Sequence, residues 1–202
     1  MSNGDQLGLV GGSTIEVGTR RSDETSVGQA VVLLEWDGLI VENMLLFGHS
    51  VTVVAVVDQQ AHEARLAEGW GPVTDRMSVA LWGEWPEHAV VPPPVMSLTG
   101  FIARSPRWQR ALAIASGFVG FGSTAILLDQ DHEPNEHCLI AAHLRGIAVL
   151  RSGRSSGDAA LVRPGRTGPV PTARPTVVSR WVEELVYERF VGSDCFMVSG
   201  VE

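Results

Sequence analysis

The chain has 202 residues, a formal net charge of −8 at pH 7 and 45% hydrophobic residues, which is typical of one sizeable folded domain or two small ones. An acidic chain is a poor candidate for binding nucleic acid or an anionic membrane surface. All 15 basic residues are arginine, and the lack of lysine excludes a Schiff base to pyridoxal phosphate, a P-loop lysine and a lysine general base.

The first residues, Met-Ser-Asn-Gly-Asp-Gln, lack the basic and apolar regions of a signal peptide. No apolar run approaches the roughly 18 residues of a membrane span. The two cysteines, Cys138 and Cys195, do not form a disulfide framework and favour a reducing compartment. We therefore expect a soluble cytoplasmic protein with no nucleic-acid or membrane partner.

The N-terminal half is expected to be rich in strands. Residues 1–28 are rich in Gly, Ser, Thr and Asp, and we expect this segment to be partly mobile. A strand-rich part should follow over residues 29–91, with strands expected at 29–36, 39–41, 44–47, 51–57 and 77–82. Asp37-Gly38 predicts a hairpin turn between the first two of these strands. Asp58 should cap a short helix over residues 59–68 that ends at Gly69.

Three consecutive prolines, Pro92 to Pro94, form the best linker in the sequence. They predict a second part over residues 95–202, the alternative being one continuous domain. The elements expected there are an extended segment at 95–103, a helix from Ser105-Pro106 to Ser116, a strand at 123–129, a loop-rich stretch at 151–176 and a closing helix at 179–190. This alternation predicts an α/β fold with some parallel strand pairing.

Residues 125–150 are the most informative segment and predict a strand, a polar loop, a capped helix and a second strand. Asn135 is a good N-cap residue, and Gly146 suits the left-handed position that ends a helix. This arrangement places His137 in the first turn of a helix on the C-terminal side of a strand, where α/β proteins usually perform their chemistry.

This segment resembles the phosphohistidine ("swivelling") domain of phosphoenolpyruvate-utilising enzymes. The matching sequences are Ile126-Leu127-Leu128-Asp129, Leu139-Ile140-Ala141-Ala142, Gly146-Ile147-Ala148-Val149 and, further upstream, Ser105-Pro106-Arg107-Trp108. The resemblance implies a swivelling β/β/α unit in the C-terminal half, over residues 95–175, with His137 at the phosphorylated position. The chain departs from the family in lacking its paired glycines and in having Glu136 where the family has Ser or Thr.

A second resemblance concerns Gly153-Arg-Ser-Ser-Gly157, which is similar to a loop in the small swivelling domain of aconitase-X-type dehydratases. It implies that the chain is the small subunit of a lyase or dehydratase and contributes a wall of Arg and Ser side chains to a shared active site.

The candidate catalytic residues are His137, Glu136 and Cys138. A helix N-terminus favours neutral imidazole and would stabilise an attached phosphoryl group, whereas Glu136 and its acidic neighbours would repel it. Cys138, in the same turn, is an alternative nucleophile, although small apolar cysteines are commonly buried core residues. The candidate substrate-binding residues are Asn135, Arg151, Arg154, Ser155 and Ser156.

Two further groups of residues have side chains that could form binding sites. The acidic and histidine side chains of residues 129–143 include many metal-ligand types, but their spacing matches no standard site, so no metal site is predicted. Arg151, Arg154, Arg163 and Arg166 could clamp a carboxylate or phosphate, the alternative being a solvated loop. No cofactor is identified, and Mg²⁺ would enter only with a partner.

Three functions are therefore predicted. The first is a phosphoryl-carrier component that uses His137 and needs a separate partner, because no nucleotide-binding motif is present. The second is the lyase or dehydratase small subunit acting on a small-molecule substrate. The third is a degenerate swivelling domain that serves as a binding or assembly module.

Overall fold

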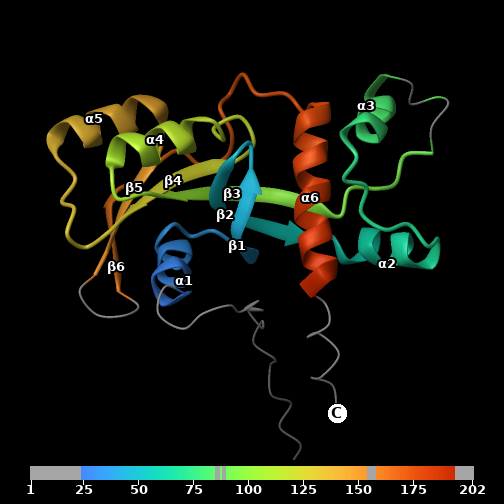
Figure 1. The fold of residues 1–202 in the computed structure, drawn as a ribbon, viewed down its shortest axis with the longest axis horizontal. Helices are drawn as coiled ribbons and strands as arrows, with labels where there is room; N and C mark the ends of the chain where they lie inside the picture. The colour runs from blue at the N-terminus through green and yellow to red at the C-terminus, as the bar shows by residue number, and fades with distance from the viewer. Residues whose placement is uncertain (1–23, 85–86, 88–89, 154–157, 194–202) are drawn as a thin grey trace, which may run out of the picture.

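The fold is described from a computed structural model that covers residues 24–84, 87, 90–153 and 158–193. The strands are β1 (Leu39–Leu46), β2 (His49–Val57), β3 (Met96–Arg104), β4 (Ser123–Leu128), β5 (Ala148–Ser152) and β6 (Ala159–Arg163). The helices are α1 (Glu24–Leu33), α2 (Gln59–Ala67), α3 (Arg76–Glu84), α4 (Trp108–Ser116), α5 (Glu136–Arg145) and α6 (Val177–Ser193). Figure 1 shows their arrangement.

The strands form one mixed sheet in the order β1-β2-β3-β4-β5-β6. The first three strands run antiparallel to one another, β3, β4 and β5 are parallel, and β6 returns antiparallel to β5. Helices α4 and α5 connect the parallel strands. The predicted α/β class with some parallel pairing is thus confirmed. Every residue of β4 is buried, as expected for a parallel strand covered on both faces.

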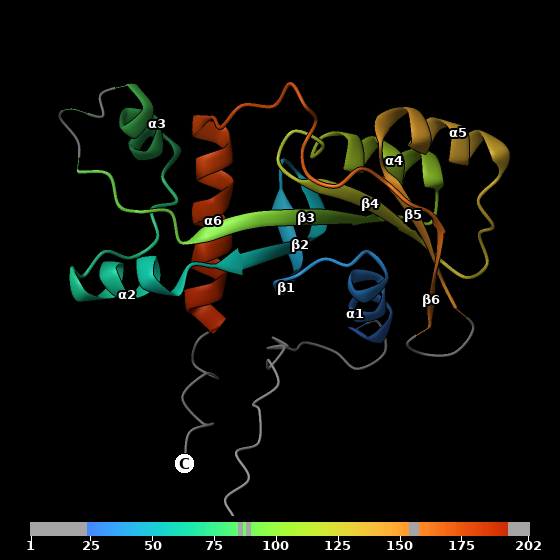
Figure 2. The same cartoon turned by 180° about the vertical axis from the view of Figure 1, so that it is seen from behind.

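Alternate residues of each strand pack into two separate cores. Ile126 and Leu128 of β4 belong to the larger core, which α4, α5 and α6 also enter. Ala125 and Leu127 face the opposite way and pack with residues of α1. Figures 1 and 2 show α4 and α5 on one face of the sheet and α1 on the other.

One sheet joins the two predicted parts of the chain. Strands β2 and β3 lie on either side of Pro92–Pro94, and Val57 is paired with Met96 in the register. All strands in the described ranges belong to this sheet, so these residues supply one β layer with helices on both faces.

The predicted strand at residues 29–36 is wrong, because α1 and the turn after it occupy this stretch. Val27, Ala30 and Val31 are buried at helical spacing, while Val32 is 68% exposed. The apolar run at residues 30–34 is short and continuous, and such a run does not distinguish a strand from a helix. It also begins inside α1, so it does not mark where the helix starts.

The predicted strand at residues 77–82 is also wrong, because α3 spans it. Asp75 accepts hydrogen bonds from the Ser78 hydroxyl, at 2.7 Å, and from the Ser78 backbone N–H, at 2.8 Å. These two bonds hold the pKa of the exposed Asp75 carboxyl below its usual value, and the bond from the hydroxyl contributes most. They are the pattern of a capped helix start, a signal that the apolar run obscured.

The hairpin turn lies later than expected. Phe47 and Gly48, both at positive φ, connect β1 to β2, as a two-residue turn between antiparallel strands requires. The predicted cap of α2 is confirmed, because the Asp58 carboxylate accepts a hydrogen bond from the Ala61 N–H at 3.0 Å. Gly69, at φ +72°, follows that helix as predicted.

Candidate functional site

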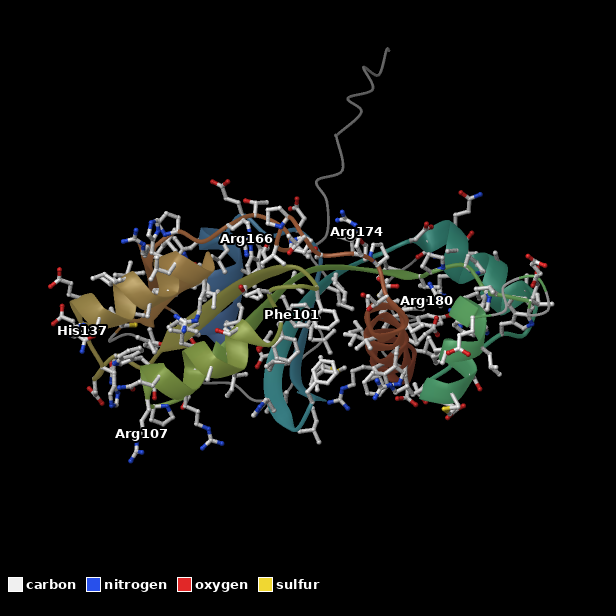
Figure 3. All side chains as sticks on the ribbon, turned by 90° about the horizontal axis from the view of Figure 1, so that it is seen from above. Phe101, Arg107, His137, Arg166, Arg174 and Arg180 are labelled. Carbon is white, nitrogen blue, oxygen red and sulfur yellow. The ribbon has the colours of Figure 1, made fainter. Side chains whose placement is uncertain are left out.

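The carboxyl ends of the parallel strands form the edge at which the predicted site should lie. Strands β3, β4 and β5 end at Arg104, Leu128 and Ser152, and α4 and α5 begin just after the first two of them. We call this region the carboxyl edge. Ligands of open α/β sheets usually bind there. Figure 3 shows His137 and Arg107 at this end of the molecule, far from Arg180.

His137 lies in the first turn of α5 and is exposed. The predicted caps of this helix are both confirmed. The Asn135 side chain accepts a hydrogen bond from the Cys138 N–H at 2.9 Å, and Gly146 adopts the left-handed conformation with φ +68°. Asn135, a predicted substrate-binding residue, therefore already has a structural role. Glu136 shares the first turn and is also exposed.

Cys138 points into the larger core and is fully buried. Burial raises the pKa of its thiol, whereas a nucleophilic cysteine needs a lowered pKa. Its environment is therefore that of a small core residue.

Two of the four arginines considered as an anion clamp, Arg151 and Arg166, contact opposite ends of the segment that contains α5. The Arg151 guanidinium lies 3.5 Å from the Glu133 carboxylate and so links the end of β5 to the acidic loop before α5. Arg166 instead donates a hydrogen bond to the carbonyl of Arg145, at the opposite end of α5 from His137. The predicted Arg154, Ser155 and Ser156, on which the lyase-subunit hypothesis depends, lie outside the described residues.

A broad open hollow lies at the start of α4, on the carboxyl edge. It has a volume of about 820 Å³ and is lined by Ser105, Pro106, Arg107, Gln109 and Arg110. The helix begins at Trp108, with Arg107 in the N-cap position and no side-chain cap, so it starts later than the predicted Ser105-Pro106. Both arginines are exposed and add positive charge to the edge that carries His137.

No group of three or more His, Cys, Asp or Glu side chains suited to a metal ion occurs among residues whose structure is described. The acidic loop points its side chains into solvent, because Asp131, His132 and Glu133 are all exposed. The ligand types that are dense in the sequence of this loop therefore do not converge on one point.

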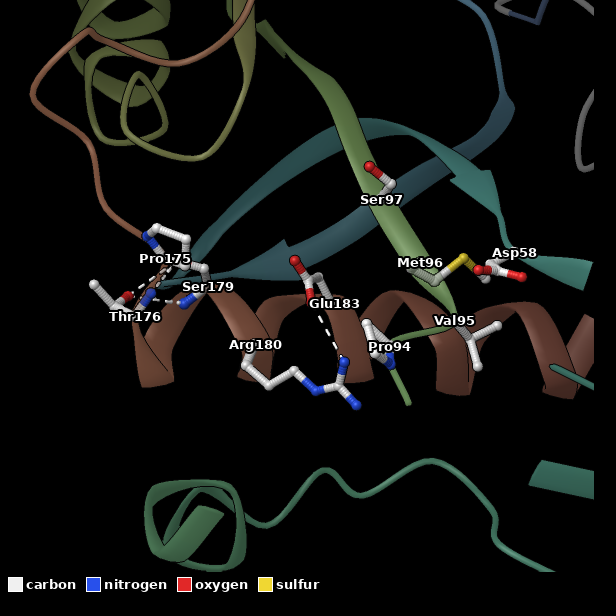
Figure 4. A pocket seen from close by; sticks show the side chains of 10 residues that line it. All are labelled: Asp58, Pro94, Val95, Met96, Ser97, Pro175, Thr176, Ser179, Arg180 and Glu183. Atoms are coloured by element: carbon white, nitrogen blue, oxygen red, sulfur yellow. Dashed lines mark hydrogen bonds and ion pairs between the residues drawn. The ribbon is translucent and has the colours of Figure 1, made fainter. Parts of the chain in front are cut away.

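A second hollow, which sequence reasoning missed, lies between α6 and the start of β3. It has a volume of about 430 Å³ and is shown in Figure 4. We call it the α6 hollow. Its lining residues are Asp58, Pro94, Val95, Met96, Ser97, Pro175, Thr176, Ser179, Arg180 and Glu183. These residues are far apart in the sequence, so no local pattern could have brought them together.

Glu183 is the most perturbed acid of the α6 hollow. Burial raises the pKa of its carboxyl to about 7, although Arg180 on the preceding turn pulls in the opposite direction. The two side chains approach to 3.7 Å. A carboxyl with a pKa near neutrality inside a hollow is a recognised indicator of a functional site.

A buried ionic network lies behind this hollow. The Arg65 guanidinium donates to both carboxylate oxygens of Glu184, at 2.8 and 3.0 Å, and its Cζ lies 4.7 Å from the centre of the Tyr187 ring. Arg180 also contacts Glu184, at 2.9 Å, and the Val73 N–H donates to it at 2.9 Å. The helical spacing of Ala61 and Arg65 was the one sequence signal that Arg65 lies on a buried face.

No protein-family model matches the chain, and no curated protein or solved structure is significantly similar to it. Among the described helices, none is long and apolar enough to cross a membrane. The geometry of the two sites therefore carries the functional inference.

Proposed function

We propose that this chain is a phosphoryl-carrier component in which His137 accepts a phosphoryl group from a donor held by a separate partner protein. The observation that carries the proposal is an exposed imidazole in the first turn of α5, on the carboxyl edge of the sheet. The free N–H groups and the positive end of the helix dipole favour an anion at this position.

The transfer needs only the imidazole and a phosphorylated donor. The unprotonated ring nitrogen attacks phosphorus, the nitrogen–phosphorus bond forms and the bond from phosphorus to the donor's leaving oxygen breaks. The leaving oxygen keeps the electron pair, and the other ring nitrogen releases its proton to solvent. The donor is a nucleoside triphosphate or phosphoenolpyruvate on the partner, since the chain carries no P-loop lysine.

Some of the charges around His137 favour a bound phosphoryl group and others oppose it. Arg107 and Arg110 line the open hollow at the same edge, and arginines favour phosphate through paired hydrogen bonds. Arg151 partly neutralises Glu133, at 3.5 Å. Glu136 opposes the phosphoryl group by charge repulsion, so the phosphorylated state is a high-energy form that passes its group on.

The outer face of α5 offers a docking surface for the partner. Ile140 is 49% exposed and Leu144 is 77% exposed. His137, Ile140 and Leu144 follow one another at spacings of three and four residues and so share one side of the helix. A partner that covers the two apolar side chains would meet the imidazole at the same time.

The proposal is tested by intact mass spectrometry after incubation with phosphoenolpyruvate or ATP in an extract of the source cells. We expect one acid-labile phosphate on the wild type, none on His137→Ala and an unchanged amount on His143→Ala. His143 is a matched control because it is exposed on the last turn of the same helix. A phosphate that persists in His137→Ala, or none with either donor, would overturn the proposal.

The exposed apolar pair favours a second function, a docking module in which His137 takes no part. Leu144→Glu should slow phosphorylation about tenfold if docking precedes transfer, because it places a charge in the contact. If a strain that carries His137→Ala keeps the cellular function of the protein while a strain that carries Leu144→Glu loses it, the docking function replaces the carrier function.

A further inference from the structure

Strand β6 (Ala159–Arg163) forms one outer edge of the sheet and pairs on one side only, with β5. Figures 1 and 2 show it at the rim of the sheet, beside α1. No other strand of the described ranges lies along its outer side, so the backbone N–H and C=O groups that point outward there have no partner in the sheet. A free edge of this kind can accept a further strand.

The side chains of β6 do little to protect this edge. Ala160, Leu161 and Val162 are exposed in succession, and Leu161 and Val162 are 37% and 41% exposed. Edge strands usually carry a lysine, another charge or a proline that prevents pairing with a second chain, and none of these occurs from Ala159 to Val162. A strand added at this edge would remove apolar surface from water.

A β-bulge near the end of β6 decides which side chains share a face. Arg163 is paired with Val149, and the register then shifts so that Val162 has no partner in β5. Ala160 is paired with Arg151, two residues further along β5. Paired residues point to the same face of a sheet, and so do residues two apart in a strand. Arg163 and Ala160 therefore lie on one face, although they are three residues apart.

The two ends of β6 carry opposite charges on this face. Asp158 lies two residues before Ala160 and so shares its face, and its carbonyl accepts a hydrogen bond from the Gly153 N–H at 2.6 Å, which extends the pairing with β5. In the part of the chain that the structure describes, neither the Asp158 carboxylate nor the Arg163 guanidinium has an ion-pair partner. The strand is therefore complementary in charge to a second copy of itself that runs in the opposite direction.

We propose that β6 pairs antiparallel with β6 of a second copy of this chain, about a two-fold axis at Ala160, with Val162 outside the ladder in both copies. In this register Asp158 of each copy lies opposite Arg163 of the other, and Leu161 lies opposite Ala159 on the other face. A parallel arrangement would bring like charges together. The contact uses none of the residues on α5 that the carrier function needs, so either proposal can fail without the other.

The test is sedimentation equilibrium of the full chain from micromolar to millimolar concentration. We expect a monomer–dimer equilibrium in the wild type. Arg163→Asp and Asp158→Arg should each raise the dimer dissociation constant about tenfold, because each replaces two attractive cross-strand pairs with two like-charge pairs. The double variant that carries both substitutions should regain the wild-type dissociation constant, since it restores both pairs with their signs exchanged.

Two controls separate pairing at this edge from other effects. Arg174→Asp makes the same charge change at an exposed position outside the sheet and should leave the dissociation constant unchanged. Amide hydrogen exchange should slow in β6 as the concentration rises and stay constant in β1, the other edge strand. A chain that stays monomeric throughout, single variants that dimerise as well as the wild type, or a double variant that does not regain the dimer would each overturn the proposal.

Discussion

Glu183 and Glu184 are neighbours on α6 with opposite surroundings. Glu184 is 1% exposed, accepts hydrogen bonds from Arg65 and the Val73 N–H, and forms an ion pair with Arg180. Glu183 has its closest described cation at 3.7 Å, and burial raises the pKa of its carboxyl to about 7. One acid therefore holds the structure together, whereas the other reduces stability whenever it is ionised.

Glu183→Gln should stabilise the protein by an amount that grows as the pH rises from about 4.5 to about 7. The usual pKa of the carboxyl is 4.5 and its folded pKa is about 7, so between these values the folded state binds more protons and stability falls as pH rises. We expect no difference from the wild type at pH values below the lower pKa. Above the higher one, the variant should gain about 1–2 kcal/mol after solvent screening is allowed for.

Urea unfolding at a series of pH values measures this difference. If the free energies of unfolding of the variant and the wild type differ by the same amount at every pH, Glu183 does not titrate between pH 4.5 and about 7. A variant that is less stable at alkaline pH would show that the contact with Arg180 outweighs the cost of burial.

Glu184→Gln should be strongly destabilising. It leaves the buried Arg65 charge without its carboxylate, a change that costs about 3–5 kcal/mol in buried ion pairs. The exposed Glu188→Gln on the same helix should change the free energy of unfolding by less than about 0.5 kcal/mol. Denaturant titration followed by tryptophan fluorescence compares them, and similar losses in the two variants would mean that the buried network contributes little.

At the scale of the element, α5 depends on its two ends. Asn135→Ala removes the acceptor of the Cys138 N–H and should cost about 1 kcal/mol, whereas Asn135→Asp keeps an equally good cap. Thermal unfolding by circular dichroism compares the two variants. If both melt at the same temperature as the wild type, the cap does not stabilise the helix that presents His137.

The elements that the sequence predicted well are those with distinct boundary residues. Asn135 and Gly146 bound α5, and Asp58 and Gly69 bound α2. Strand β2 was predicted from its β-branched residues. Helices α1 and α3 were missed because their apolar residues form short runs that do not show the 3.6-residue spacing of a helix. Their helical structure depends on the burial of one face against the rest of the protein.

The two sites were predictable to different degrees. His137 was placed correctly in the first turn of a helix, because a single local segment specifies that position. The burial of Cys138 and the engagement of Arg166 with the far end of α5 depend on packing across the sheet. The α6 hollow joins Asp58, Ser97 and Glu183 through the pairing of β2 with β3 and the return of α6, which no local pattern encodes.

At the scale of the whole molecule, the prolines at 92–94 do not interrupt the sheet. Strand β2 pairs with β3 across them, and Arg65 reaches the Pro93 carbonyl as well as Glu184 on α6. The residues on both sides therefore share one core and one ionic network, and we expect them to unfold together.

Native-state hydrogen exchange checks this cooperativity. The slowest amides of β2 and β4 should open with free energies that agree within about 1 kcal/mol, because both need global unfolding to exchange. A much lower opening free energy for β2 would show that residues 29–91 unfold independently of the second part.

The most direct test of the carrier function is to map the phosphate by fragment mass spectrometry at neutral to alkaline pH, after incubation with a phosphoryl donor in the source-cell extract. The chain has six histidines, so the position of the phosphate is decisive. If the exposed first turn of α5 is the acceptor site, the phosphate maps to His137. A phosphate on any other histidine, or no phosphate with phosphoenolpyruvate or ATP as donor, contradicts the carrier function.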